Sequence, residues 1–351
     1  MEDFVMKRKL LATGLCLTVA ATALMGCSNS GSNSEESVAS EVAETTETEA
    51  AETETAAETE ETVVEVAIDE DEFSYPLTLE DAYGNEVTVE EEPSTVVTVS
   101  PAITEIIYAL GGESKLIGRS DYDDYPEAVA DIQAVGPIDL PDTELIVSLE
   151  PDVVLASSIF SEEAYNALTD AGITVVIVKD ETSLDGMIYT VETVADVIGL
   201  HDAGQELAMG LSDQISEIYN QANETIAEDG ITVYYCMGFG EYGDYTAGPD
   251  TFINDIITYA GCVNAASDAD GWSYSTEQLL AADPDIILVP DWGYDAFIST
   301  EPYSELSAVQ NNAVVSVDAN IFERVGPRNV DALQLVYETA LDYHSVAHAG
   351  A

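Results

Sequence analysis

Basic residues are scarce in this sequence. The 351 residues contain only eight Lys and Arg against 69 Asp and Glu, and three of the eight stand together at positions 7–9. From residue 73 onward, five basic residues face 51 acidic ones, which gives a net charge of −46. Because phosphate backbones are bound by clustered Lys and Arg, nucleic acid is excluded as a partner.

Cysteine and histidine are also few. Cys236 and Cys262 are the two cysteines after residue 72, and the sequence leaves open whether they form a disulfide. The three histidines are too few, and too far from the ends of the predicted strands, for a zinc or manganese site or for a catalytic base. The sequence also lacks GxGxxG, a P-loop and a serine elbow, so we expect a binding protein that is not an enzyme and has no metal site or cofactor of its own.

Residues 6–27 have a basic segment, an apolar run too short to span a bilayer, and small residues after it. This pattern predicts an export signal peptide. Its end, "LMGC", resembles a bacterial lipobox, in which Cys27 is lipidated and anchors an extracytoplasmic protein to the cell membrane. The alternative is an ordinary cleaved signal with an incidental cysteine. Residues 28–72 contain 16 acidic residues and no basic or aromatic one, which predicts a disordered acidic linker.

From residue 73 onward, apolar strand patterns alternate with amphipathic helical ones, which is typical of an α/β fold with mainly parallel sheets. The segments "TELIVSLEPDVVLA" from Thr143 and "TEQLLAADPDIILV" from Thr276 are alike and predict two lobes of similar architecture. A long helical pattern at about 202–227 separates them. We therefore expect a domain over 73–343 with two Rossmann-like lobes, about 93–200 and 229–343, joined by a single long hinge helix.

Aromatic residues gather where the predicted strands end. Ligands of open α/β sheets bind beyond the carboxyl ends of the strands, and aromatic rings there suit a large, flat ligand. We expect about half of these rings to contact ligand and the others to pack against loops. The segment "IFERVGPRNV" adds two of the five remaining cations near a strand end, Arg324 and Arg328; Arg328 either contacts ligand or braces its loop. The predicted ligand-binding residues are Tyr122, Tyr125, Phe160, Phe239, Tyr245, Trp272, Trp292, Phe322 and Arg324.

Three motifs, "SPAITE", "SDYDDYP" and "FERVGPR", occur in the order seen in periplasmic binding proteins that serve importers of cobalamin and iron–siderophore complexes. The sequence resembles this family over about residues 75–343, and the cobalamin-binding members are most similar. The family carries tryptophans in the N-lobe cleft where this chain has Ile138 and Ser157.

The resemblance implies a helical-backbone binding protein that delivers a metal chelate to an ABC permease dimer with its ATPase. It implies that Tyr122 stacks on the ligand, that Arg324 is a cleft arginine, and that Glu144 and Glu277 each dock one lobe on the permease.

Charge bears on the identity of the ligand. A domain with a net charge of −46 repels ferric catecholates, which carry several negative charges. Corrinoids are therefore expected first, ferric hydroxamate siderophores second and haem third; Arg119, Arg324 and Arg328 are the arginines available to such a site. An acidic surface or adhesion lipoprotein is the alternative from a different class, but it does not account for the repeated lobes or the aromatic strand ends.

Overall fold

A computed structural model describes residues 73–241 and 243–348. The chain divides into two units, residues 1–72 and 73–351, and the elements given below belong to the second. The predicted signal peptide, Cys27 and the acidic linker lie outside the described residues. Within the described ranges, none of the helices combines the length and the apolar character that a membrane span requires.

The second unit begins with a β-hairpin. Strand β1 (Leu77–Glu80) pairs antiparallel with β2 (Glu86–Val89). The side chain of Asp81 accepts hydrogen bonds from two backbone N–H groups of the turn, and Gly84 there has φ of +79°, which glycine adopts without a steric penalty. The backbone N–H of Ala82 donates to a carbonyl of strand β6, so the hairpin is attached to the sheet of the N-lobe.

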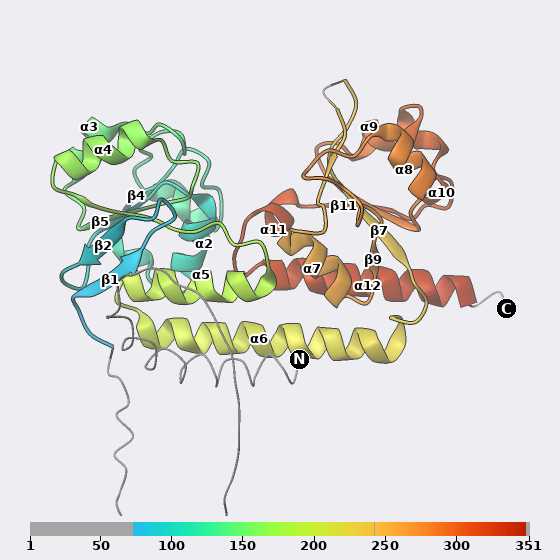
Figure 1. Ribbon diagram of the computed structural model, residues 1–351, viewed down its shortest axis with the longest axis horizontal. Helices are drawn as coiled ribbons and strands as arrows, with labels where there is room; N and C mark the ends of the chain where they lie inside the picture. Colours follow the sequence, from blue (N-terminus) through green and yellow to red (C-terminus); the bar gives the residue numbers. More distant parts are fainter. Residues whose placement is uncertain (1–72, 242, 349–351) are drawn as a thin grey trace, which may run out of the picture. The chain divides into compact units, whose positions relative to one another are not determined.

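The N-lobe is a parallel sheet with the order β4-β3-β5-β6, and helices connect its strands (Figure 1). Its elements are β3 (Val96–Thr98), α2 (Pro101–Ala109), β4 (Leu116–Gly118), α3 (Thr143–Leu149), β5 (Val153–Ala156), α4 (Glu162–Asp170), β6 (Thr174–Ile177) and α5 (Leu184–Val197), with short 3-10 turns at Glu113–Lys115 and Glu127–Asp131.

The C-lobe repeats this plan with the order β11-β10-β7-β8, and β9 also pairs with β7. All pairs are parallel except β7 with β8. Its elements are β7 (Thr232–Gly238), β8 (Tyr245–Thr246), α7 (Phe252–Tyr259), β9 (Val263–Asn264), α8 (Thr276–Ala282), β10 (Ile286–Pro290), α9 (Tyr294–Ser299), a 3-10 turn (Tyr303–Glu305), α10 (Ser307–Gln310), β11 (Val314–Val317), α11 (Ala319–Glu323) and α12 (Asn329–His348).

The internal repeat is visible in the hydrogen bonds. In each lobe a seven-residue helix, α3 or α8, ends at a residue in the left-handed region and is followed by Pro-Asp and a buried strand. The aspartate then accepts hydrogen bonds from a threonine at the start of the neighbouring strand: Asp152 from Thr95, and Asp285 from Thr232, both through backbone N–H and hydroxyl groups at 2.8–3.0 Å. The Pro-Asp pairs therefore hold adjacent strands in register in both lobes.

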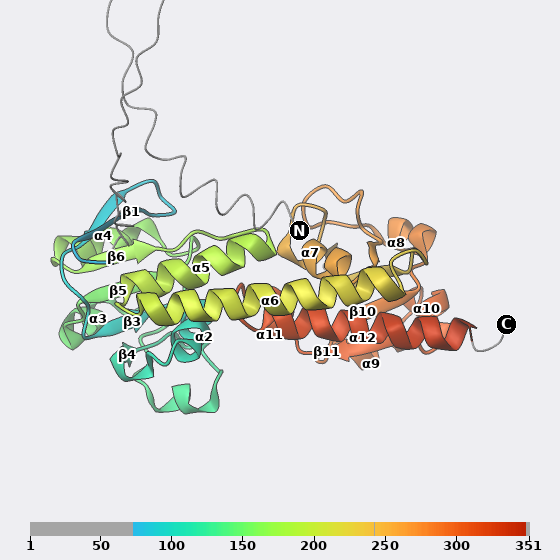
Figure 2. The same ribbon diagram turned by 90° about the horizontal axis from the view of Figure 1, so that it is seen from below.

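The lobes are joined by the predicted long helix. Helix α6 (His201–Thr225) runs beneath both lobes, with α5 and α12 packed on it (Figures 1 and 2). Its buried face, including Leu211 and Ile215, belongs to one hydrophobic core that contains residues of both lobes, such as Ile103 and Ile253. Two smaller cores fill the outer sides of the sheets, one in each lobe. The lobes thus share a common base and do not meet only at a linker.

Cys236 and Cys262 are both buried in the C-lobe, and neither forms a disulfide. Cys236 lies in β7 and Cys262 just before β9. The question that the sequence left open is therefore answered: both are free thiols.

Candidate functional site

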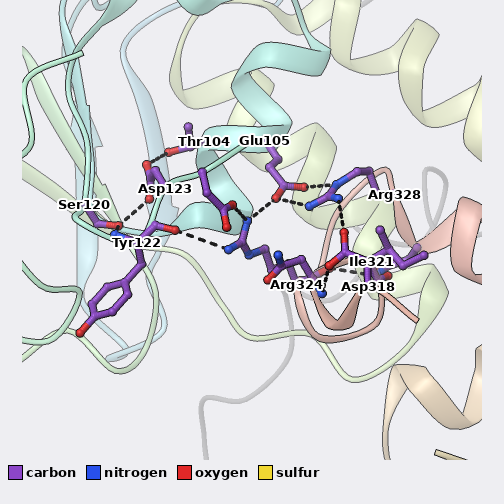
Figure 3. A network of polar contacts seen from close by, with 12 residues as sticks. Thr104, Glu105, Ser120, Tyr122, Asp123, Asp318, Ile321, Arg324 and Arg328 are labelled. Carbon is purple, nitrogen blue, oxygen red and sulfur yellow. Dashed lines mark hydrogen bonds and ion pairs between the residues drawn. The ribbon is translucent and has the colours of Figure 1, made fainter. Parts of the chain in front are cut away.

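Two exposed tyrosines stand on the loop that follows β4. Tyr122 is 58% exposed and Tyr125 is 47% exposed. The loop is held by Asp123, which accepts 2.5 Å hydrogen bonds from the hydroxyls of Thr104 and Ser120, and Ser120 in turn accepts the backbone N–H of Tyr122 at 3.2 Å (Figure 3). Burial raises the pKa of Asp123, although both hydroxyl hydrogen bonds oppose that shift. Asp123 therefore fixes the place from which Tyr122 is presented.

The C-lobe presents aromatic rings in the same way. Tyr245, Trp272 and Trp292 are 43%, 48% and 67% exposed. Tyr245 and Trp272 lie on adjoining segments, because the backbone N–H of Thr246 donates to the carbonyl of Trp272 at 2.9 Å. Trp292 lies two residues after the end of β10. An aspartate again organises the region: Asp244 accepts hydrogen bonds from the hydroxyls of Tyr303 and Thr276, both at 2.5 Å.

Two of the predicted ligand contacts, Phe160 and Phe322, are core residues instead, and a third, Phe239, is partly buried against a core. Phe160 is 2% exposed within the outer core of the N-lobe, and Phe322 is fully buried and stacked on Tyr235. Phe239 packs edge-on against two rings of the outer C-lobe core, those of Phe297 and Tyr303. Assigning Phe160 and Phe322 to the ligand was wrong, because their rings have no surface to offer, and Phe239 serves mainly as packing.

Arg324 and Arg328 do not stand free. Nη1 of Arg324 donates to Glu105 Oε1 at 2.8 Å and to Asp124 Oδ1 at 2.6 Å, and its Nη2 lies 3.4 Å from the carbonyl oxygen of Tyr122 (Figure 3). Burial alone would lower the pKa of Arg324, but the hydrogen bonds to Asp124 and Glu105 outweigh it and hold the pKa above its usual value. Arg328 forms a bidentate pair with Glu105, at 2.7 Å from Nε and 2.6 Å from Nη2.

Both arginines connect the C-lobe to the tyrosine loop of the N-lobe, the segment after β4 that carries Tyr122 and Tyr125. The guanidinium of Arg328 lies 4.2 Å from the ring centroid of Tyr125, a cation–π contact, and its Nη1 lies 3.3 Å from Asp318. Arg328 is therefore a brace between the lobes. Arg119 braces the same loop from within the N-lobe, because it donates to the carbonyls of Val129 and Ser120 at 3.0 and 2.7 Å.

Glu144 and Glu277 occupy equivalent places in the two lobes. Each is the second residue of its helix, α3 or α8, and each is exposed. Both helices lie on the side of the lobes away from α6 (Figure 1). An aspartate caps the first helix and a serine the second, so neither glutamate is needed to cap its helix.

Sequence reasoning missed the acidic residues that hold this region. Glu105 occurs in the motif "SPAITE", and Asp123 in "SDYDDYP", but neither received a role. A carboxylate inside an otherwise apolar helix pattern is a signal for a buried ion pair, and Glu105 fits it. Across the described part of the chain, no group of three or more His, Cys, Asp and Glu could hold a metal ion.

A pocket of about 520 Å³ lies elsewhere, between β1, the end of β6, α5 and the start of α6. It is lined by polar and apolar residues of the N-lobe, among them Tyr189, Glu192 and His201. None of the predicted ligand-binding residues lines it.

Comparison with known proteins gives related sequences that cover most of the chain. The ABC transporter substrate-binding lipoprotein YvrC of Bacillus subtilis, itself described as uncharacterized, is 32% identical over 270 residues, 76% of this chain and 85% of YvrC. The cobalamin-binding protein of Halobacterium salinarum is 30% identical over 273 residues, 74% of this chain and 73% of the relative.

Solved structures share the architecture. The periplasmic heme-binding protein RhuT from Roseiflexus sp. RS-1 superposes with a TM-score of 0.65 at 26% identity, over 71% of this chain and 98% of RhuT. The vitamin B12-binding protein BtuF of Vibrio cholerae superposes with a TM-score of 0.61 at 23% identity, over 72% of this chain and 98% of BtuF. This likeness supports the fold. The profile of the periplasmic binding protein family matches residues 96–321, from the first strand of the N-lobe to α11. The chain belongs to the periplasmic binding protein family.

Proposed function

We propose that this chain is the extracytoplasmic receptor of an ABC importer, and that it captures a flat metal chelate, with a cobalt corrinoid as the first choice. The observation that carries the proposal is the set of exposed rings in both lobes: Tyr122 and Tyr125 on the loop after β4 of the N-lobe, and Tyr245 in β8 with Trp272 and Trp292 on loops of the C-lobe. Rings of this kind bind a planar ligand by stacking and by burial of apolar area.

The charges near these rings support a corrinoid over an anionic chelate. Both arginines beside the tyrosine loop are already paired with carboxylates, so they add no free positive charge for an anion. The relatives at 30% identity that are named cobalamin-binding proteins support the same choice. A haem receptor is the second candidate, and the 26% identity to a heme-binding structure favours it.

Calorimetric titration of the purified domain with cyanocobalamin, cobinamide, hemin and ferrichrome tests the proposal. We expect one of the two corrinoids to bind most tightly. Tightest binding of hemin would establish the haem receptor instead, and an absence of heat with all four would reject a chelate receptor.

The proposed partner is a permease dimer with its ATPase, and the proposed anchor is a lipid on Cys27. A receptor with two like lobes fits across a permease of two like subunits, and Glu144 and Glu277 place one carboxylate on each lobe for it. Exposed carboxylates of this kind affect association through complementary charge, and salt weakens the effect.

The double variant Glu144→Ala/Glu277→Ala is expected to retain ligand affinity in solution but to lose uptake through the importer. Each single variant should lose less, because one lobe stays docked. The matched control is Glu206→Ala/Glu224→Ala, which removes the same charge from exposed positions on α6, on the other side of the lobes (Figure 1). Full uptake by the first pair, or equal loss by both pairs, would contradict the docking assignment.

A further inference from the structure

Glu105 is a buried carboxylate that joins the two lobes. It lies in α2 of the N-lobe, is 5% exposed, and has apolar neighbours on the buried face of the helix. Its Oε1 accepts from both Arg324 and Arg328 of the C-lobe, and its Oε2 accepts from Nε of Arg328 (Figure 3). A charge this deeply buried requires charged partners, and the two arginines supply them.

The contacts with Glu105 use hydrogen-bond donors of both arginines. Nη1 of Arg324 and both Nε and Nη2 of Arg328 donate to Glu105, while the exposed carboxylates of Asp124 and Asp318 take further donors. Three carboxylates therefore face two guanidinium groups, so the cluster carries a net charge of −1 beside the rings of Tyr122 and Tyr125.

The other Lys and Arg residues of the described chain do not supply a free positive charge in place of Arg324 and Arg328. Lys115 pairs with Glu92, Lys179 with Glu80, and Arg119 donates to backbone carbonyls inside the N-lobe. In the described part of the chain, every Lys and Arg side chain donates to a carboxylate or to a backbone carbonyl. A ligand at the tyrosine loop therefore meets no unpaired Lys or Arg there.

We infer that Glu105 determines which ligand charge the site accepts: by holding Arg324 and Arg328, it makes the site selective for a near-neutral chelate and against an anionic one. This inference rests on the proposed function and names the residue that sets its selectivity. If the Glu105 charge is removed, the two guanidinium groups lose their buried counter-charge, and an oxygen of an anionic ligand can supply one in its place.

Glu105→Gln tests the inference because glutamine has nearly the same shape and no charge. Two probes are titrated by calorimetry or by quenching of the tryptophan fluorescence: cyanocobalamin, which is near neutral, and a ferric tricatecholate, which is anionic. Affinity for the tricatecholate should rise by about tenfold or more, the scale of a charge-assisted hydrogen bond. Affinity for cyanocobalamin should change much less.

Two control variants separate this effect from a general change of charge. Glu206→Gln removes one exposed carboxylate on α6 and should leave both affinities unchanged. Glu105→Gln/Arg324→Gln should lose the gain in tricatecholate affinity, because removing Arg324 returns the charge of the cluster from 0 to −1. If Glu105→Gln does not fold, Asp124→Asn replaces it: that carboxylate is 59% exposed, and its loss releases one bond of Arg324, so a smaller gain is expected.

The outcomes distinguish this inference from the proposed function. A wild-type protein that binds cyanocobalamin but binds the tricatecholate more tightly overturns the inference, as does a folded Glu105→Gln without gained tricatecholate affinity. A wild-type protein that binds neither corrinoid rejects the proposed ligand, and the inference is then decided on the tricatecholate alone.

Discussion

Tyr122 shows what a single side chain contributes at the ligand surface. Its ring is 58% exposed, while its backbone is fixed on one side by Ser120 and approached on the other by Arg324. Tyr122→Ala is expected to weaken ligand binding about tenfold or more, the scale of a stacked aromatic contact with its buried area. The measurement is a calorimetric titration with the ligand that the wild-type protein binds most tightly.

A matched control is Tyr189→Ala. Tyr189 is 59% exposed, but it stands on α5 beside the N-lobe pocket, away from the tyrosine loop. Affinity should be unchanged in this variant. Equal loss in both variants, or no loss in a folded Tyr122→Ala, would remove Tyr122 from the ligand site.

Individual residues were the hardest part to predict from sequence. Tyr122, Tyr125 and Trp292 are exposed beyond strands, as expected, but Phe160 and Phe322 follow the same local pattern and turn into the cores. A local pattern does not say whether a ring beyond a strand packs inward or points outward. The role of Glu105 depends on partners 219 and 223 positions away, which no local spacing reveals.

At the scale of secondary-structure elements, the two Pro-Asp pairs fix how α3 and α8 lead into their strands. Asp152 accepts hydrogen bonds from Ser94 and Thr95, and Asp285 accepts them from Thr232 and from the hydroxyl of Tyr343. Asp285→Ala should lower the free energy of unfolding by roughly 1–3 kcal/mol because it leaves partly buried donors without an acceptor, and Asp152→Ala by roughly 0.5–1.5 kcal/mol because water can reach its exposed hydrogen bonds. Urea unfolding followed by circular dichroism measures the loss.

Asp250→Ala is the control for these variants, since Asp250 is an exposed loop residue. It should unfold at the wild-type urea concentration. If Asp152→Ala and Asp285→Ala also unfold there, the Pro-Asp pairs do not stabilise the lobes.

Most of the longer secondary-structure elements could be predicted from the sequence. The repeat, the β-hairpin and the long helix have local signals of apolar period, Pro-Asp and Gly-Asn, and the structure contains all three. Short elements such as β8 and β9, of two residues each, have no period of their own. They form because β7 offers them a partner, which is a consequence of tertiary structure.

For the whole binding domain, the shared core limits movement. Helix α6 and the residues packed on it form a hydrophobic core that extends under both lobes, so a large rotation of one lobe would separate buried apolar surfaces. Small-angle scattering profiles with and without saturating ligand are therefore expected to nearly superpose. A marked fall in the radius of gyration on ligand binding would show that α6 bends and that the core divides between the lobes.

The two buried cysteines have a consequence for the conditions in which the domain works. Burial raises the pKa of both thiols to about 12, with Asp244 adding to the shift at Cys236 and Asp285 at Cys262. The thiolate is the form that reacts with oxidants, so at neutral pH neither cysteine is readily oxidised. The native domain also contains no disulfide among its described residues that a reductant could break. We therefore expect the fold of the described residues to depend little on the redox potential of the surroundings.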